Sequence, residues 1–185
     1  MRVIVVGLCV GLLTQTLSAG QPAISARELA GYRLTAPVLT QFEEASRLIA
    51  DATRHDPAFA QSPLFTEEIS VSGDAPAMAA ALESRLRNHP ALSQALRTAH
   101  ITSREYTRFA LALVAARLAH GFVTSGVLRT VPAGVAADNV AFVEAHHAEI
   151  AAILKTLGID DNLENPLMSD TIATCRRTAP QAPHS

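Results

Sequence analysis

The side chains best suited to chemistry in this chain are polar residues that interrupt apolar helical segments. In segment 137–157 apolar residues recur every three or four positions, and His146 falls in the middle of their arc. A buried imidazole without a partner costs on the order of 1–3 kcal/mol, so we expect a specific one. If His146 is structural, its partner would be a backbone carbonyl or the Tyr106 hydroxyl. If it is functional, its partner would be haem or a metal ion. The other candidate ligands for such a cofactor are His120, His147 and Met78.

Glu144 and His147 are three residues apart, which places a carboxylate and an imidazole on neighbouring turns of one helix. Di-iron bundles use this Glu-x-x-His spacing twice and add two glutamates from other helices. The sequence has no second Glu-x-x-His, and both residues fall at or beyond the edge of the apolar arc. We retain Glu144 and His147 as weak metal-ligand candidates and favour a solvated pair.

Arg117 and His120 interrupt the apolar segment 103–125. A buried guanidinium without a partner would be very costly, so we expect a carboxylate to meet Arg117. The candidate partners are Glu83, Glu144 and Glu149. Such a pair would fix the register of two helices, and the alternative is that Arg117 binds an anion inside a pocket. Arg117 and His120 therefore join His146 as weak cofactor-binding candidates.

The known catalytic and metal-binding motifs are absent from the sequence. It has no Gly-x-Ser-x-Gly, His-Glu-x-x-His or Cys-x-x-Cys, and no glycine-rich loop between a strand and a helix. Fifteen Lys and Arg against 17 Asp and Glu leave no excess of positive charge to neutralise phosphates, so no nucleic-acid role is expected. We predict no catalytic residue and no particular cofactor.

The elements that must position these side chains are all helical. Apolar periodicity and local capping signals predict four longer helices and one short helix that starts at Pro90. The longer helices are expected at about 37–54, 75–88, 103–125 and 137–157. Residues 58–75 read as a long loop, in which only Ile69 to Val71 alternate like a strand. The expected fold is an all-α, compact bundle.

The segment 103–125 gives the clearest local signal. Thr102 and Glu105 have the spacing of a capping box, in which each side chain bonds a backbone N–H near the other residue. Apolar residues then cover most of the circumference of the helix. A helix of this kind is usually buried, so we expect it to lie in the centre of the bundle.

The N-terminal 20 residues have the layout of a signal peptide. Arg2 precedes an uncharged apolar run, and small residues follow, so cleavage is expected after Ala19 or Gly20. This predicts a periplasmic or secreted protein without a membrane span after cleavage, with an uncleaved N-terminal anchor as the alternative. Residues 21–34 are expected to be a linker, 35–160 the helical domain and 161–185 a flexible tail.

Cleavage would leave Cys175 as the last cysteine, because Cys9 lies in the apolar run. An internal disulfide would then be impossible. Cys175 is expected to be a free thiol beside two arginines, and the alternative is a dimer linked through Cys175.

Several short motifs resemble those of a group of small secreted, all-helical bacterial proteins. They are Tyr32-Arg33-Leu34-Thr35, His89-Pro90-Ala91-Leu92, Arg104-Glu105-Tyr106, Pro132-Ala133-Gly134-Val135 and Asn139-Val140-Ala141-Phe142-Val143. The resemblance covers about residues 32–157 and implies an exported helical domain without supplying an activity. The expected function is non-enzymatic binding of a protein or small-molecule partner in the bacterial envelope. The alternative is a haem- or metal-binding bundle that uses His146.

Overall fold

We describe residues 23–55 and 75–159 of a computed structural model. The expected signal peptide, the 58–74 part of the predicted loop and the tail with Cys175 lie outside these residues. The described residues form seven helices and no strand, so the all-α prediction is confirmed. The helices are α1 (Ala26–Gly31), α2 (Ala36–His55), α4 (Ala75–Asn88), α5 (Pro90–Thr98), α6 (Ser103–Thr124), α7 (Ala137–Ala145) and α8 (His147–Thr156).

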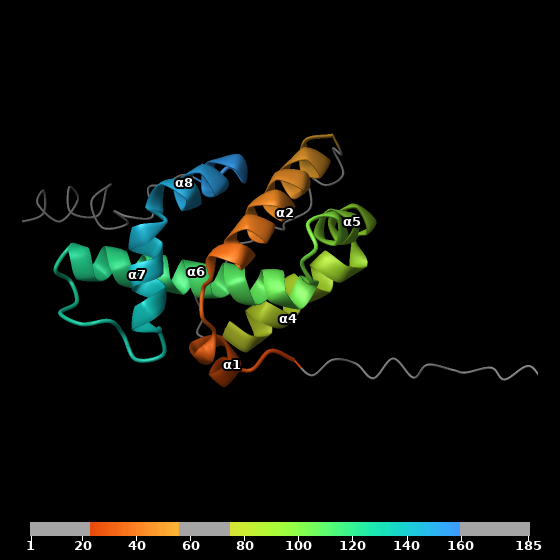
Figure 1. The fold of residues 1–185 in the computed structure, drawn as a ribbon. Helices are drawn as coiled ribbons and strands as arrows, with labels where there is room; N and C mark the ends of the chain where they lie inside the picture. The colour runs from red at the N-terminus through yellow and green to blue at the C-terminus, as the bar shows by residue number, and fades with distance from the viewer. Residues whose placement is uncertain (1–22, 56–74, 160–185) are drawn as a thin grey trace, which may run out of the picture.

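Helix α6 runs across the width of the molecule, as Figure 1 shows, with α2 and α8 on one side and α1 and α4 on the other. It contacts α1, α2, α4, α5 and α7, which confirms its central position. The buried residues of α6 are Tyr106, Thr107, Phe109, Ala112, Leu113, Ala116 and Ala119.

Only the Thr102 half of the predicted capping box forms at the start of α6. The Thr102 hydroxyl accepts a 3.0 Å hydrogen bond from the Glu105 backbone N–H. The Glu105 carboxylate does not complete the box, because its Oε1 accepts a 2.7 Å hydrogen bond from the Tyr32 hydroxyl. A local cap residue therefore also makes a long-range contact.

Aromatic rings fill the core where α2 crosses α6. Phe42 stacks on Tyr106 with ring centroids 4.6 Å apart and lies 4.9 Å from the ring of Phe109. The buried hydroxyls of Ser46 and Tyr106 share a 3.3 Å hydrogen bond. This pairing satisfies the phenol inside an otherwise apolar layer.

The two tyrosines of the chain, Tyr32 and Tyr106, should make the folded domain sensitive to alkali. Burial raises the pKa of Tyr106 to about 12, although its hydrogen bond to Ser46 opposes the shift. Burial, followed by the Glu105 hydrogen bond, also raises the pKa of Tyr32. The folded chain therefore holds these protons more tightly than the unfolded chain, whose tyrosines have a pKa of about 10.

The resulting stability is complete below pH ~10 and is lost as the pH rises towards ~12. We expect the midpoint of urea denaturation to fall over this range, and Tyr106→Phe to reduce that dependence. Tyrosinate absorbance should appear only as helical circular dichroism is lost. Tyrosinate that forms near pH 10 in a chain with full helical signal would contradict this prediction.

The last predicted helix is broken into two, which corrects the expectation of one continuous helix over 137–157. The break is at His146, whose φ of -112° and ψ of 21° are not helical. Helix α7 packs on α6, whereas α8 packs on α2, which crosses α6. The change of direction at His146 lets the two halves of the segment reach both helices.

Segment 23–34, expected to be a linker, is part of the fold. Ser25 caps α1 by accepting a 3.2 Å hydrogen bond from the Glu28 N–H. Ile24 is fully buried, and Tyr32 and Leu34 are also buried. The segment is therefore anchored through the apolar residues that flank α1.

Gly158 ends α8 as its position predicts. Its φ of 72° is in the left-handed region, and the next N–H, of Ile159, donates a 2.9 Å hydrogen bond to the carbonyl of Leu154. None of the helices in the described ranges is long and apolar enough to cross a membrane.

Candidate functional site

His146 lies at the α7/α8 break and is partly exposed, so the expectation of a buried imidazole was wrong. Its Nδ1 is 2.9 Å from Glu149 Oε2, and its ring packs 4.3 Å from that of Phe142. The Tyr106 hydroxyl, proposed as its partner, bonds Ser46 instead. The break in the helix is the physical reason, because it turns His146 away from the core that a continuous helix would have faced.

The Glu144 and His147 side chains are both exposed, as expected for a solvated pair. Across the described parts of the chain, no three His, Cys, Asp or Glu side chains are grouped so that they could hold a metal ion. The structure therefore does not bring Glu144 and His147 into a cluster with the other candidate ligands.

Arg117 and His120 are partly exposed, so Arg117 is not the fully buried cation that its sequence position suggested. Two of its three candidate partners contact other residues. Glu149 bonds His146, and buried Glu83 lies 3.7 Å from the Arg87 guanidinium, within α4.

An ionic cluster that the sequence did not reveal joins α1 to α6. The Arg104 guanidinium donates from Nη2 to both carboxylate oxygens of Glu28, at 2.8 and 3.0 Å. Arg108 lies one turn further along α6, with its Nε 3.5 Å from Glu28 Oε1. The Glu28 carboxylate is therefore seated between two arginines.

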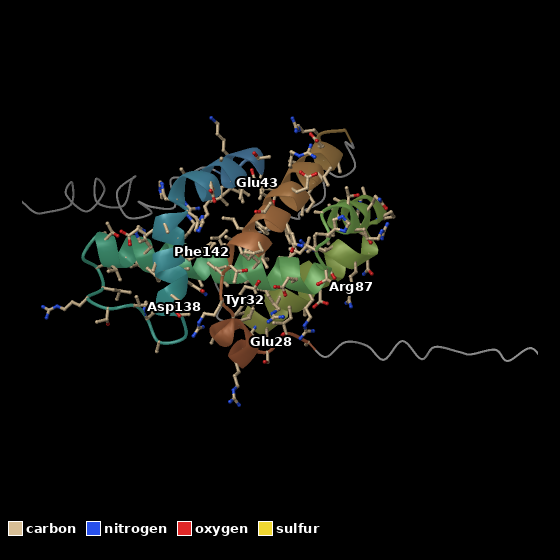
Figure 2. All side chains as sticks on the ribbon, in the orientation of Figure 1. Glu28, Tyr32, Glu43, Arg87, Asp138 and Phe142 are labelled. Carbon is tan, nitrogen blue, oxygen red and sulfur yellow. The ribbon has the colours of Figure 1, made fainter. Side chains whose placement is uncertain are left out.

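Tyr32 and Glu105 both contact Arg108 in this cluster. The Arg108 guanidinium lies 4.8 Å from the centroid of the Tyr32 ring, a cation–π contact. Glu105 accepts from the Tyr32 hydroxyl and from Arg108 Nη1, the latter at 3.3 Å. In Figure 2, Glu28 and Tyr32 lie on the same side of α6. The buried Arg108 Nε nevertheless makes no hydrogen bond.

Asn139 on α7 is a second long-range contact that the sequence did not reveal. Its side-chain Oδ1 accepts a 2.9 Å hydrogen bond from the Leu34 N–H, and its Nδ2 donates a 3.0 Å hydrogen bond to the Tyr32 carbonyl. Asn139 is buried and so replaces the water that would otherwise solvate this stretch of backbone.

A second, outer side of α6 is apolar but is not part of the core. We call it the outer stripe, and its residues alternate four and three positions apart. They are Arg104, Arg108, Leu111, Ala115, Leu118 and Phe122. All six are partly exposed, and Val114 beside them is 45% exposed. The four apolar members do not join the core cluster that the described helices form or its partly buried border.

The apolar circumference of α6 therefore includes the partly exposed residues of the outer stripe as well as the buried residues. These observations define a small all-α domain with a partly exposed apolar surface on α6. Comparison with protein-family models, curated proteins and solved structures gives no match for this chain.

Proposed function

We propose that the protein is exported and acts by binding a partner protein rather than by catalysis. The observation that carries the proposal is the outer stripe. Contiguous exposed apolar surface is a feature of interaction sites, whereas single exposed apolar residues are ordinary. Leu111, Leu118 and Phe122 share one side of a helix that the described core leaves partly uncovered.

A photo-crosslinking amino acid at Leu118 tests this proposal in cells that make the protein. The matched control position is Ala152, which is exposed on α8. We expect one protein to crosslink from position 118 and not from 152, and mass spectrometry to identify it. The purified partner should then bind Leu118→Glu at least ~10-fold more weakly than Ala152→Glu, a difference of about 1.4 kcal/mol. Equal binding of the two variants would contradict the proposal.

Export is tested by the mass of the protein isolated from the cell envelope. Cleavage after Ala19 or Gly20 would give a chain that starts at residue 20 or 21. An intact N-terminus in the membrane fraction would instead support the uncleaved anchor. A disulfide-linked dimer in the same sample, lost in Cys175→Ser, would support pairing through Cys175.

The second candidate function is haem or metal binding through His146. It is favoured by the 2.9 Å contact between His146 Nδ1 and Glu149, because a carboxylate on one ring nitrogen orients the other towards a ligand. Native mass spectrometry of the envelope protein should show added mass, and His146→Ala should remove it. A bare chain, or added mass that survives the substitution, would exclude this site.

A further inference from the structure

The break between α7 and α8 lies in a segment whose residues favour an unbroken helix. Residues 144–149 read Glu-Ala-His-His-Ala-Glu, and alanine and glutamate are strong helix formers. The break nevertheless omits the hydrogen bonds that the N–H groups of Ala148 and Glu149 would donate four residues back in a continuous helix. The local sequence and the fold therefore favour different conformations at His146.

The contacts around His146 do not require the break. Its ring packs on Phe142, four residues earlier, and its Nδ1 contacts Glu149, three residues later. Side chains at these spacings are neighbours on one side of an uninterrupted helix. The His146 N–H donates to the Phe142 carbonyl and the His146 carbonyl accepts from the Ile150 N–H, both of which are helical four-residue bonds. All these contacts would be kept if residues 137–157 formed one helix.

Packing on two different helices sets the directions of α7 and α8. Helix α7 packs on α6, and its buried Asn139 bonds the backbone near the start of the domain. Helix α8 turns away from the line of α7 at the break and packs on α2 (Figure 1). The buried residues of α8 are Ile150, Ile153 and Leu154, which lie on one face. Helix α8 is therefore an arm that is joined to a fixed helix by the single residue His146.

We propose that the chain forms a dimer by exchange of α8. In this dimer residues 137–157 of each copy form one continuous helix, and α8 of each copy packs on α2 of the other. The apolar contacts of α8 are conserved in the exchange, because the second copy supplies an identical α2. The helix also gains the backbone hydrogen bonds that the break omits. The exchange is reciprocal, so it gives a closed dimer with twofold symmetry.

A second copy is the occupant that the structure specifies for this face of α2. The face accommodates Ile150, Ile153 and Leu154, and another copy of the chain carries these side chains at the same spacing. Association costs translational and rotational entropy, so the dimer forms only as the protein concentration rises. The inference goes beyond the proposed function, because it concerns α2 and α8 and does not involve the outer stripe.

Two substitutions of His146 test the exchange through the ability of one residue to continue a helix. His146→Ala and His146→Gly remove the same side-chain contacts, but glycine disfavours a continuous helix relative to alanine. Each dimer contains two such helices, so the dimer dissociation constant of His146→Ala should be at least about 10-fold lower than that of His146→Gly. Ala152→Gly is the control, because this exposed position lies within α8 in both forms, and it should leave the wild-type constant unchanged.

Native mass spectrometry measures the monomer and the dimer after each chain is refolded from urea at a series of concentrations. All chains carry Cys175→Ser and are kept under reducing conditions, so that no disulfide contributes to the dimer. Circular dichroism checks that each variant is folded. A folded His146→Ala chain that stays monomeric at every concentration would overturn the proposal, as would equal dissociation constants for the Ala and Gly variants.

Isotope labelling shows whether the dimer exchanges α8. An unlabelled chain with a photo-crosslinking amino acid at Leu157, which packs against the core at the end of α8, is refolded together with a heavy-isotope-labelled chain that lacks it. In the dimer fraction we expect crosslinks from α8 of the unlabelled chain to α2 of the labelled chain. Crosslinks confined to α2 of unlabelled chains would show a dimer without exchange and would overturn the proposal.

Discussion

Phe109→Ala is expected to lower the free energy of unfolding by about 3–5 kcal/mol. Phe109 is fully buried and packs against Phe42 where α2 crosses α6. Its removal deletes a large apolar side chain and leaves a cavity that neighbouring helices can fill only in part. Urea denaturation followed by circular dichroism measures the change.

Leu118→Ala on the same helix is the matched comparison. Leu118 is partly exposed on the outer stripe, so less apolar area is covered and we expect a loss below about 1.5 kcal/mol. A loss as large as that of Phe109→Ala would show that the isolated chain already buries the stripe. That result would also weaken the proposed docking surface.

Asn139→Ala has the second largest expected effect, a loss of about 2–4 kcal/mol. The substitution leaves the Leu34 N–H and the Tyr32 carbonyl without their partner, and each unsatisfied buried group costs about 1–3 kcal/mol. Asn139→Asp should lose at least as much, because its carboxylate can accept from Leu34 but buries a charge and places an acceptor against the Tyr32 carbonyl.

The control for Asn139 is its neighbour Asp138, whose contact with Arg33 is long and exposed. The closest atoms are 3.5 Å apart, and the two side chains are 52% and 84% exposed. Asp138→Ala should therefore change the stability by less than about 0.5 kcal/mol. If both variants had the same small effect, the Asn139 bonds would not stabilise the fold as we infer.

The helices that could be predicted from the sequence are those with local signals at their ends. The Thr102 cap, Pro90 and Gly158 each act within a few residues, and α2, α4, α5 and α6 begin and end close to the expected positions. The break at His146 has no such signal, because no proline or glycine marks it. It follows from tertiary packing, in which α7 and α8 contact different helices.

The candidate site was harder to predict because its contacts join distant parts of the chain. Glu28 and Arg104 are 76 residues apart, and no periodic pattern links them. The polar residues that do stand out, His146 and Arg117, drew attention because they interrupt apolar segments. Both side chains are partly exposed in the structure, so each can remain in contact with water.

The same signal, an apolar α6, supported one correct and one incomplete conclusion. Its central position was correctly predicted. The pattern alone could not show that the face carrying Leu111 and Leu118 would lie outside the described core. An apolar helix face has the same sequence pattern whether it packs inside the domain or binds a partner.

The bonds of Asn139 also set an order in which the domain can be completed. They connect residues 105 and 107 positions apart in the chain, to Leu34 and Tyr32. The backbone near the start of the domain cannot acquire these partners until the chain has emerged beyond residue 139. Contacts of such long range form late and slow the folding of a domain. Most of the domain must therefore be synthesised before the backbone at Tyr32 and Leu34 can form these hydrogen bonds.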